Sequence, residues 1–371
     1  MKVLVVSGIW PPDVGGPASH APDVAAYLHG RGHAVEVVVT ASARPAPQPY
    51  PVHWVARAIP KGAIHVRTGL EVARRARRAD VVYTTGMFGR SAGGAALARR
   101  PYVLKLTADP AFERARRRGM VHGDVEAFQQ ASVGPAIRAL RLARDAELRG
   151  AAHVFTPSAW LRDLAVAWGV DATRVSVLPN PSPPLPELRP RDELRASFDM
   201  NGPTLAFAGR LTAQKSLDVA LAAVDAVDGV TLLIAGDGDE RARLEGLAGP
   251  RVRFLGAQPR ERVVELFRAA DASILSSSWE NFPHTVVEAL AVGTPVLATS
   301  TGGVAEVVHD GENGLLVPSG DEPALAAAIR RYLDDAALRE RLRANAASSV
   351  AEYAPERIFG TLEETLERVA R

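Results

Sequence analysis

The sequence predicts an α/β protein of two domains, each built on a parallel β-sheet with helices on both faces. Three observations support this prediction. With 371 residues, the chain is longer than one ordinary domain core. Apolar, β-branched runs alternate with longer helical patterns, as expected of sheets covered on both faces. A proline-rich segment, PNPSPPLPELRP at 179–190, interrupts this alternation near the middle of the chain.

The composition is that of a folded globular protein. Hydrophobic residues make up 47% and charged residues 23%, which excludes a mainly disordered chain. The net charge of +2 gives no reason to expect a nucleic-acid partner. The absence of cysteine excludes disulfides and thiolate metal sites and is compatible with a cytoplasmic location. The first apolar run is interrupted at 10–13, so we expect a strand there rather than a signal peptide, and no run approaches the roughly 18 apolar residues of a membrane span.

The first domain is expected to span residues 1–183. The proline-rich segment at 179–190 is expected to be the linker, because proline lacks the N–H that a strand donates to its neighbour and no packed strand can run through this segment. The boundary at residue 183 places the first prolines of this linker in the first domain. A helical pattern follows the first strand near 20–32. The predicted strands of this domain are the apolar runs at 2–6, 34–40, 80–85, 102–107, 153–157 and 175–179.

The second domain is expected to span residues 184–355, and a final helix in 356–371 is expected to pack back on the first domain. In open α/β sheets ligands bind beyond the carboxyl ends of the strands, so candidate site residues are sought there, in a cleft between the two domains. The predicted strands of the second domain lie at 204–209, 230–236, 252–256, 272–277, 294–300 and 314–317.

Candidate phosphate-binding residues follow the first strand of each domain, two glycines in the first domain and two cations in the second. Gly15 and Gly16 precede a predicted helix, where they would allow a diphosphate to approach the helix start; an ordinary strand-to-helix loop is the alternative. Arg210 and Lys215 follow the strand at 204–209. A planar guanidinium and an ammonium at a strand end suit a pyrophosphate, whereas solvated loop cations are the simpler reading.

The stretch AGDGDE at 235–240 has the spacing of metal-binding carboxylates at Asp237 and Asp239. It directly follows a buried strand and contains Gly236 and Gly238, so a tight turn explains it better. Because hard cations need more oxygen ligands than this segment offers, we expect no metal site.

Two glutamates stand out in SWENFPHTVVEAL, which begins at residue 278. Glu280 falls in a loop after the predicted strand, and Glu288 falls in the first turn of a helix expected from Thr285 to Val292. Free amides at a helix start can receive a phosphate, and carboxylates accept hydrogen bonds from sugar hydroxyls. The alternatives are a surface loop charge for Glu280 and a helix-dipole partner for Glu288.

In this order, these stretches resemble the retaining glycosyltransferases of the GT-B fold, family-4 type, or glycosyl transferases group 1. Glu280 and Glu288 match the E-x7-E motif of that family, and GGVAEVVHDGENGLLV at 302–317 matches the segment that follows it. FAGRLTAQK, AGDGDE and the Gly15-Gly16 loop resemble its donor-binding stretches. The resemblance implies two Rossmann-like domains facing a cleft. It also implies metal-independent transfer of a hexose from a nucleotide-sugar, such as a UDP-sugar, to a hydroxyl acceptor, with retention of the anomeric configuration.

The resemblance also implies roles for the matching residues. Arg210, Lys215 and Glu280 would be catalytic, with the two cations stabilising the diphosphate as the glycosidic bond breaks. Glu280 would hold hydroxyls of the donor sugar, and Glu288 the ribose. The implied donor-binding set is Gly15, Gly16, Arg210, Lys215, Gly236, Glu280, Asn281, Phe282, Pro283, His284, Thr285 and Glu288.

The chain departs from the family pattern in the first domain. Where the family often has a histidine, this chain has Thr107, Ala108 and Asp109, and we expect Asp109 to contact the donor or the acceptor. The linker lacks the Asn-Gly pair that the family often carries. Arg114 and the arginines at 116–118 suit an anionic acceptor, a peripheral contact with an anionic membrane, or a solvated face.

Two other functions stay open at this point. The first is an epimerase or hydrolase that acts on the nucleotide-sugar without an acceptor. The second is a noncatalytic module that binds a nucleotide-sugar or a membrane. The intact set of donor residues favours the transferase, with no cofactor beyond the donor substrate itself.

Overall fold

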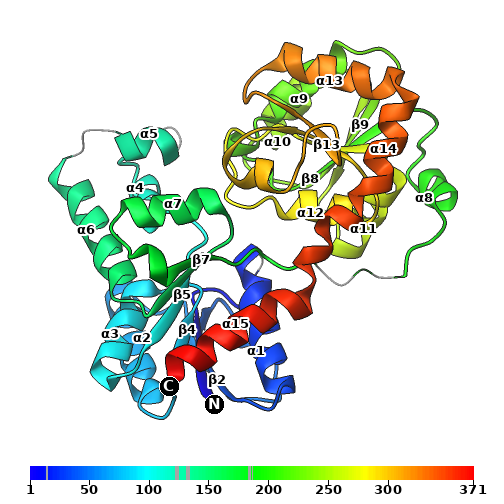
Figure 1. Cartoon of the computed structure of the whole chain (residues 1–371). Helices are drawn as coiled ribbons and strands as arrows, with labels where there is room; N and C mark the ends of the chain where they lie inside the picture. Colours follow the sequence, from blue (N-terminus) through cyan, green and yellow to red (C-terminus); the bar gives the residue numbers. More distant parts are fainter. Residues whose placement is uncertain (14–15, 122–124, 131–133, 183–184, 186) are drawn as a thin grey trace. The chain divides into compact units, whose positions relative to one another are not determined.

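The structure is a computed structural model that describes all residues except 14–15, 122–124, 131–133, 183–184 and 186. The chain divides into two compact units (Figure 1). Unit 1 contains Met1–Asn180 and Glu356–Arg371, and unit 2 contains Pro181–Pro355. Each unit has one sheet in which the paired strands are parallel, and helices separate the successive strands except β2 and β3. The predicted fold class, α/β with two Rossmann-like parallel-sheet domains, is confirmed.

The sheet of unit 1 has seven strands in the order β3-β2-β1-β4-β5-β6-β7. The six strands predicted in this part of the chain are present, and β3 is an additional strand at one edge. Because both faces are covered, the central strands β1, β4 and β5 are almost wholly buried. The strands are β1 (Lys2–Ser7), β2 (Ala34–Ala41), β3 (Val52–Ala56), β4 (Val81–Thr84), β5 (Tyr102–Lys105), β6 (His153–Thr156) and β7 (Val175–Val177).

The two faces of this sheet are covered by different helices. Val3 and Val5 of β1 pack with Leu28 of α1 and Leu362 of α15. The alternate residues of β1 face the other side, where α2, α3 and α6 contribute to the core. The helices of unit 1 are α1 (Gly16–Gly30), α2 (Lys61–Ala76), α3 (Phe88–Ala98), α4 (Pro110–Arg116), α5 (Val125–Gln130), α6 (Pro135–Arg149), α7 (Ala159–Ala167), η1 (Ala172–Arg174) and α15 (Pro355–Ala370).

The sheet of unit 2 has six strands in the order β10-β9-β8-β11-β12-β13. Successive strands run outward from β8 to one edge and then from β11 to the other edge. Such a reversal leaves a crevice at the carboxyl ends of the two central strands, where open α/β sheets bind their ligands. The strands are β8 (Thr204–Ala208), β9 (Thr231–Ala235), β10 (Val252–Gly256), β11 (Ala272–Leu275), β12 (Val296–Thr299) and β13 (Gly314–Val317).

The helices of unit 2 complete a single apolar core with this sheet. α9 packs with α13, and α11 packs with α12. No helix among the described residues is long and apolar enough to cross a membrane. The helices are α8 (Arg191–Ser197), η2 (Ala213–Lys215), α9 (Leu217–Asp225), α10 (Arg241–Leu247), α11 (Arg260–Ala269), α12 (His284–Ala291), η3 (Gly302–Glu306), α13 (Glu322–Asp334), α14 (Ala336–Ala346) and η4 (Ser348–Tyr353).

Candidate functional site

The candidate residues of unit 2 follow the carboxyl ends of three neighbouring strands. Arg210 and Lys215 lie in the segment after β8, Gly236 follows β9, and Glu280 lies in the loop after β11. β8 and β11 are the two strands between which the strand order reverses. The candidates therefore gather at the crevice that the topology defines.

Lys215 and Glu280 form an ion pair between Nζ and Oε1, although they are 65 positions apart in the chain. Ser277 Oγ donates a hydrogen bond to the same carboxylate oxygen at 2.7 Å. The Glu280 side chain is 8% exposed and that of Lys215 is 19% exposed. A carboxylate this buried needs charged or polar partners, and these two loops supply them. The pair still has an opening to solvent on the lysine side.

Two glycines hold the loops of this crevice at backbone contact. Gly302 has a φ of +51°, and a Cβ there would lie 1.8 Å from the carbonyl oxygen of Glu280. The neighbouring Gly303 donates its N–H to that same oxygen at 3.0 Å. A Cβ on Gly236 would lie 1.9 Å from the carbonyl oxygen of Gly209. Gly236 therefore serves the close packing of the loops after β8 and β9.

Arg210 differs from Lys215 in its surroundings within the described part of the chain. Its side chain is exposed and makes no hydrogen bond or ion pair with any of the described residues. A guanidinium without a partner at the end of a central strand is available to a phosphate or another anion.

The helix after this crevice begins one residue earlier than predicted, because α12 starts at His284. Phe282 is buried and stands edge-to-face with His284, at 5.6 Å between ring centroids, and with Tyr353 at 5.7 Å. Pro283 occupies the N-cap position of α12. The aromatic contacts thus fix the turn that joins Glu280 to the helix, and Asn281 and Thr285 are half-buried on either side of it.

The sequence predicts Glu288 in the first turn of α12, but the structure places it beyond that turn. It is the fifth residue of the helix, and the first turn has no acidic residue. A helix-dipole role is weakened by this position, because the dipole acts mainly within the first turn. The Glu288 carboxylate is 15% exposed and lies 3.5 Å from the guanidinium of Arg260. Burial raises the pKa of Glu288, and the positive charge of Arg260 opposes that rise.

The two aspartates of the AGDGDE stretch lie in the turn between β9 and α10. Asp237 accepts a hydrogen bond from its neighbour Gly238 at 2.8 Å and pairs with Arg241 of α10 at 3.2 Å. Both Asp237 and Asp239 are exposed. These contacts support the turn interpretation of this stretch.

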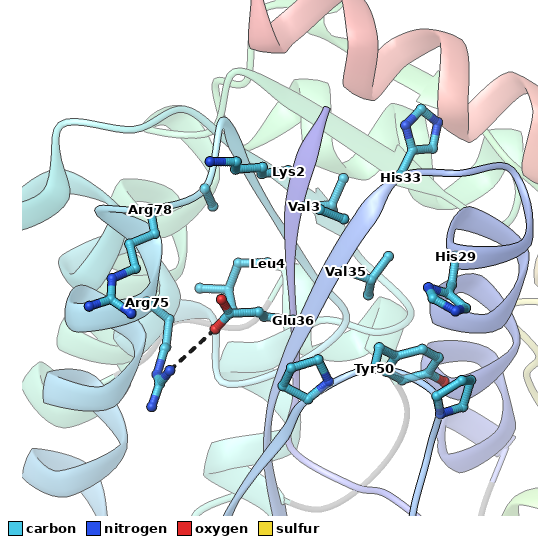
Figure 2. A pocket seen from close by; sticks show the side chains of 14 residues that line it. Lys2, Val3, Leu4, His29, His33, Val35, Glu36, Tyr50, Arg75 and Arg78 are labelled. Atoms are coloured by element: carbon cyan, nitrogen blue, oxygen red, sulfur yellow. Dashed lines mark hydrogen bonds and ion pairs between the residues drawn. The ribbon is translucent and has the colours of Figure 1, made fainter.

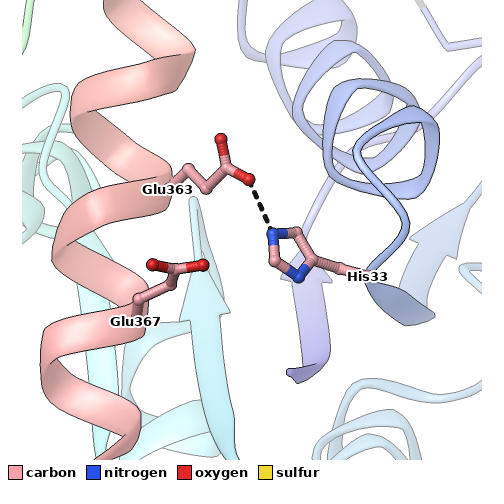
Figure 3. A group of neighbouring side chains, drawn as sticks. All are labelled: His33, Glu363 and Glu367. Atoms are coloured by element: carbon pink, nitrogen blue, oxygen red, sulfur yellow. Dashed lines mark hydrogen bonds and ion pairs between the residues drawn. The ribbon is translucent and has the colours of Figure 1, made fainter.

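One group of metal-type ligands occurs among the described residues, and it lies in unit 1 (Figure 3). His33, Glu363 and Glu367 place one ligand atom each within 4.8 Å of one another. Positive groups already surround it, because Arg31 lies 3.2 Å from Glu363 and the amino group of Met1 lies 3.3 Å from His33 Nδ1. We therefore interpret the group as the electrostatic anchor of α15. Burial acts to raise the pKa of Glu363, but hydrogen bonds from His33 and Arg31 outweigh it and lower the pKa.

Asp109 in unit 1 requires a correction. Its carboxylate has 0% exposure and lies 3.0 Å from the guanidinium of Arg144. It also accepts hydrogen bonds from the amide N–H of Ala111 at 2.8 Å, which caps α4, and from Gln129 at 2.9 Å. A carboxylate with no exposed surface and with donors on both oxygens holds the protein together, so the expected contact with donor or acceptor is not provided.

The remaining predicted positions of unit 1 are less defined. Gly15 lies outside the described residues, and Gly16 is the first residue of α1. Arg114 pairs with Glu147 at 3.0 Å, whereas the arginines at 116–118 are exposed.

A pocket of about 410 Å³ in unit 1 lies at the opposite edge of that sheet from the carboxyl ends of its strands (Figure 2). Lys2, Val3, Val35 and Glu36 line it from the amino ends of β1 and β2, with Glu36 paired to Arg75 at 3.4 Å. None of the predicted site residues lines this pocket, so it is separate from the candidate site.

Two Rossmann-like units, one with an ion pair beside the point where its strand order reverses, are the architecture of the GT-B class. Residues 15–181 match the family of glycosyl transferase 4-like domains, and residues 190–349 match the family of glycosyl transferases group 1. The chain belongs to the family-4 type of GT-B glycosyltransferases.

Individual relatives agree with this assignment. Glycogen synthase of Mycobacterium tuberculosis (strain CDC 1551 / Oshkosh) is 28% identical over 94% of this chain and 89% of that protein. D-inositol 3-phosphate glycosyltransferase of Nocardia farcinica (strain IFM 10152) is 35% identical over 52% of this chain and 46% of that protein. The chain thus spans about half the length of the first curated relatives that it matches.

Solved structures show the same fold. Anabaena Alr3699/HepE in complex with UDP and glucose superposes with a TM-score of 0.78 at 22% identity, over 99% of this chain and 100% of that one. Sucrose-phosphate synthase from Thermosynechococcus elongatus superposes with a TM-score of 0.79 at 22% identity, over 99% of this chain and 98% of that one. At these identities the likeness establishes the architecture.

Three residues of the site were missed by reasoning from sequence. Ser277 and Gly302 contact Glu280, and Arg260 contacts Glu288. Ser277 is the last residue of a predicted strand and Arg260 follows another, which is a usable signal, and Gly302 begins the segment that resembles the family. None of these signals indicates which partner the residue contacts.

Proposed function

We propose that this protein is a retaining glycosyltransferase that moves a hexosyl group from a nucleoside diphosphate sugar to a hydroxyl group of an acceptor. The observation that carries this proposal is the Lys215–Glu280 ion pair at the crevice between β8 and β11. It combines a cation for a diphosphate with a carboxylate for sugar hydroxyls at the position where such sheets bind ligands. Membership of the family and the UDP complex of a protein with the same fold support it.

In the proposed reaction, the bond between the anomeric carbon and the diphosphate oxygen breaks, and negative charge develops on the diphosphate. Arg210 and Lys215 stabilise that charge, which lowers the barrier because the cations are already in place. The acceptor oxygen bonds to the anomeric carbon from the face that the diphosphate leaves. The acceptor proton passes to a phosphate oxygen of the leaving group, so that atoms and charges balance.

The other residues serve donor binding in this proposal. Glu280 accepts hydrogen bonds from sugar hydroxyls, and Glu288 accepts them from the ribose. Asn281 to Thr285 surround the donor at the start of α12. Since Arg210 and Lys215 supply the positive charge, we propose that transfer needs no divalent metal; activity that is unchanged in EDTA tests this point.

The first test is a thermal-shift panel of nucleoside diphosphates and their sugar conjugates. A ligand that binds only the folded chain raises its unfolding temperature, so the shift identifies the base that is bound. We expect a diphosphate-specific shift in the wild type that Glu288→Ala reduces. The donor found in this way is then incubated with hydroxyl acceptors, and the glycosylated product is detected by mass spectrometry. Turnover of the donor alone, without transfer, would instead favour the epimerase or hydrolase.

A peripheral membrane contact is a second function that one observation favours. Val66 and Leu70 of α2 are each 63% exposed, and Leu97 of α3 is 70% exposed, on two helices that pack together. Exposed arginines, including Arg67 and Arg74, accompany these apolar side chains on α2. Apolar and basic residues on one surface suit an anionic bilayer. Cosedimentation with vesicles of phosphatidylglycerol and phosphatidylcholine tests this, and Leu70→Asp should abolish binding while the donor-induced shift stays.

A further inference from the structure

Arg260 and Glu288 form an ion pair between two helices of unit 2. Arg260 is the first residue of α11, which follows the edge strand β10, and Glu288 lies on α12. The guanidinium and the carboxylate oxygen Oε1 are 3.5 Å apart, and the helices pack against each other. The arginine is therefore directed at one of the two glutamates that belong to the proposed donor site.

The position of Arg260 is not explained by the stability of its own helix. A positive side chain at the first position of a helix is disfavoured by the helix dipole, whereas the next residue, Glu261, suits it. The Arg260 side chain is 49% exposed, and exposed ion pairs contribute little to folding stability. Glu288 is the partner of Arg260 among the described residues.

The effect of Arg260 on Glu288 is both electrostatic and geometric. Burial raises the pKa of Glu288, and Arg260 is the charged neighbour that counteracts it. An ionised carboxylate only accepts hydrogen bonds, whereas the protonated acid uses one oxygen as a donor. With Oε1 facing the arginine, Oε2 has no hydrogen-bond donor among the described residues and stays available to a ligand hydroxyl.

We propose that Arg260 is a positioning residue that orients the Glu288 carboxylate toward the vicinal hydroxyls of the donor ribose and so sets a preference for ribonucleotides over 2′-deoxyribonucleotides. This inference rests on the proposed function, in which Glu288 holds the ribose. Arg260 acts through Glu288 and need not touch the nucleotide. Its loss is expected to weaken recognition of the hydroxyl pair and to leave the contacts with the diphosphate unchanged.

The test measures the affinity of the intact chain for UDP, GDP and ADP and for their 2′-deoxy counterparts by titration calorimetry at pH 6 and pH 8. For the base that binds, loss of a hydrogen bond to a charged group predicts a ribose preference of about 10- to 100-fold in the wild type. Glu288→Gln should bring that ratio near 1. Arg260→Gln should reduce it by about 10-fold at pH 6. Because burial raises the pKa of Glu288 and Arg260 then no longer opposes the rise, the ratio in this variant should increase with pH.

Two further variants serve as controls. Arg260→Lys keeps the charge and should keep most of the ribose preference at both pH values. Arg243→Gln should leave the ratio unchanged, because Arg243 has a similar exposure, 48%, and pairs with Glu240 at 2.7 Å at the start of α10. Circular dichroism checks that each variant is folded.

The outcomes separate the inference from the proposed function. A wild-type ribose preference that Arg260→Gln leaves intact at both pH values overturns the inference alone. Equal losses of ribo- and deoxyribonucleotide affinity in Arg260→Gln also overturn it, because the arginine would then contact the base or the diphosphate. A wild-type chain that binds none of these nucleotides overturns the proposed function and the inference with it.

Discussion

Two buried carboxylates with cationic partners lie beyond the carboxyl ends of strands, Glu280 after β11 and Asp109 after β5. Asp109 is 0% exposed and its partner Arg144 is 4% exposed, whereas Glu280 is 8% and Lys215 is 19% exposed. Asp109 also caps a helix and binds Gln129, so both of its oxygens are engaged. The difference teaches that position at a strand end does not make a carboxylate a ligand-binding group. The carboxylate must also remain accessible from solvent while it is paired with its cation.

The largest effect on stability is expected at the Asp109–Arg144 pair, which has almost no exposed surface. Asp109→Ala removes one of the two carboxylates that pair with the buried Arg144, since Asp145 at 2.9 Å remains, and it removes the cap of α4. We expect a loss of about 2 to 4 kcal/mol in the free energy of unfolding, from the lost charge-assisted hydrogen bonds and the lost cap. Urea denaturation followed by circular dichroism measures it. A variant as stable as the wild type would contradict the structural role assigned to Asp109.

The Lys215–Glu280 pair, which is partly exposed to solvent, is expected to matter for turnover instead. Glu280→Gln keeps the size of the side chain but removes the charge that faces Lys215. We expect kcat/KM for transfer to fall by about 10²- to 10³-fold, the range seen when a preorganised electrostatic group is removed. The unfolding free energy, measured in the same urea experiment, should change far less than in Asp109→Ala. A lower unfolding free energy for Glu280→Gln than for Asp109→Ala would contradict the assignment of Asp109 to stability and Glu280 to turnover.

Arg210 adds a second cation to the Lys215–Glu280 pair, and none of the described residues forms a hydrogen bond or ion pair with its side chain. Arg210→Gln should weaken nucleoside diphosphate binding by about 10-fold, since a charge-assisted hydrogen bond to phosphate is lost. Binding of the uncharged nucleoside should be unaffected. Titration calorimetry with both ligands measures the difference, and Arg243→Gln is the matched control. Equal weakening of nucleoside and diphosphate would place Arg210 away from the phosphates.

The smallest effect is expected at a third carboxylate, Glu363, which has cationic partners but lies far from the crevice of unit 2 in the sequence and belongs to unit 1. Its pKa is lower in the folded state, so its contribution to stability is present above the pKa of the unfolded chain and is lost as the pH falls through the folded value. Glu363→Gln should cost on the order of 1 kcal/mol at pH 7 and less near pH 3. Parallel urea denaturations at the two pH values test this, with donor binding at pH 7 unchanged.

Much of the fold could be predicted because buried parallel strands are continuous apolar runs. All of the strands expected in both units are present, and the resemblance of the ordered motifs indicated the correct family. β3 was missed because it lies at the edge of the sheet and is only half-buried. Its sequence, VHWVA, is therefore not a continuous apolar run, and it follows a proline-rich stretch.

The site could be predicted only as far as strand ends and motifs reach. The spacing placed Glu280 and Lys215 in separate loops, but the ion pair between them depends on the neighbouring positions of β8 and β11 in the sheet. Asp109 was wrongly expected to contact a ligand because Gln129 and Arg144, which enclose it, lie 20 and 35 positions further along the chain. No local sequence pattern predicts that a side chain such as Asp109 will be enclosed by residues so far along the chain.

The return of α15 to unit 1 has a consequence for folding on the ribosome. Ile358, Phe359, Leu362 and Leu366 are buried in the core that α15 shares with β1 and α1. Unit 1 therefore lacks part of its core until these residues have emerged, although its first 180 residues are made before unit 2. Unit 2 is contiguous in the chain and can close its own core earlier. The order of synthesis and the order of completion are thus opposite, and nascent unit 1 exposes an apolar sheet face to chaperones while unit 2 is being made.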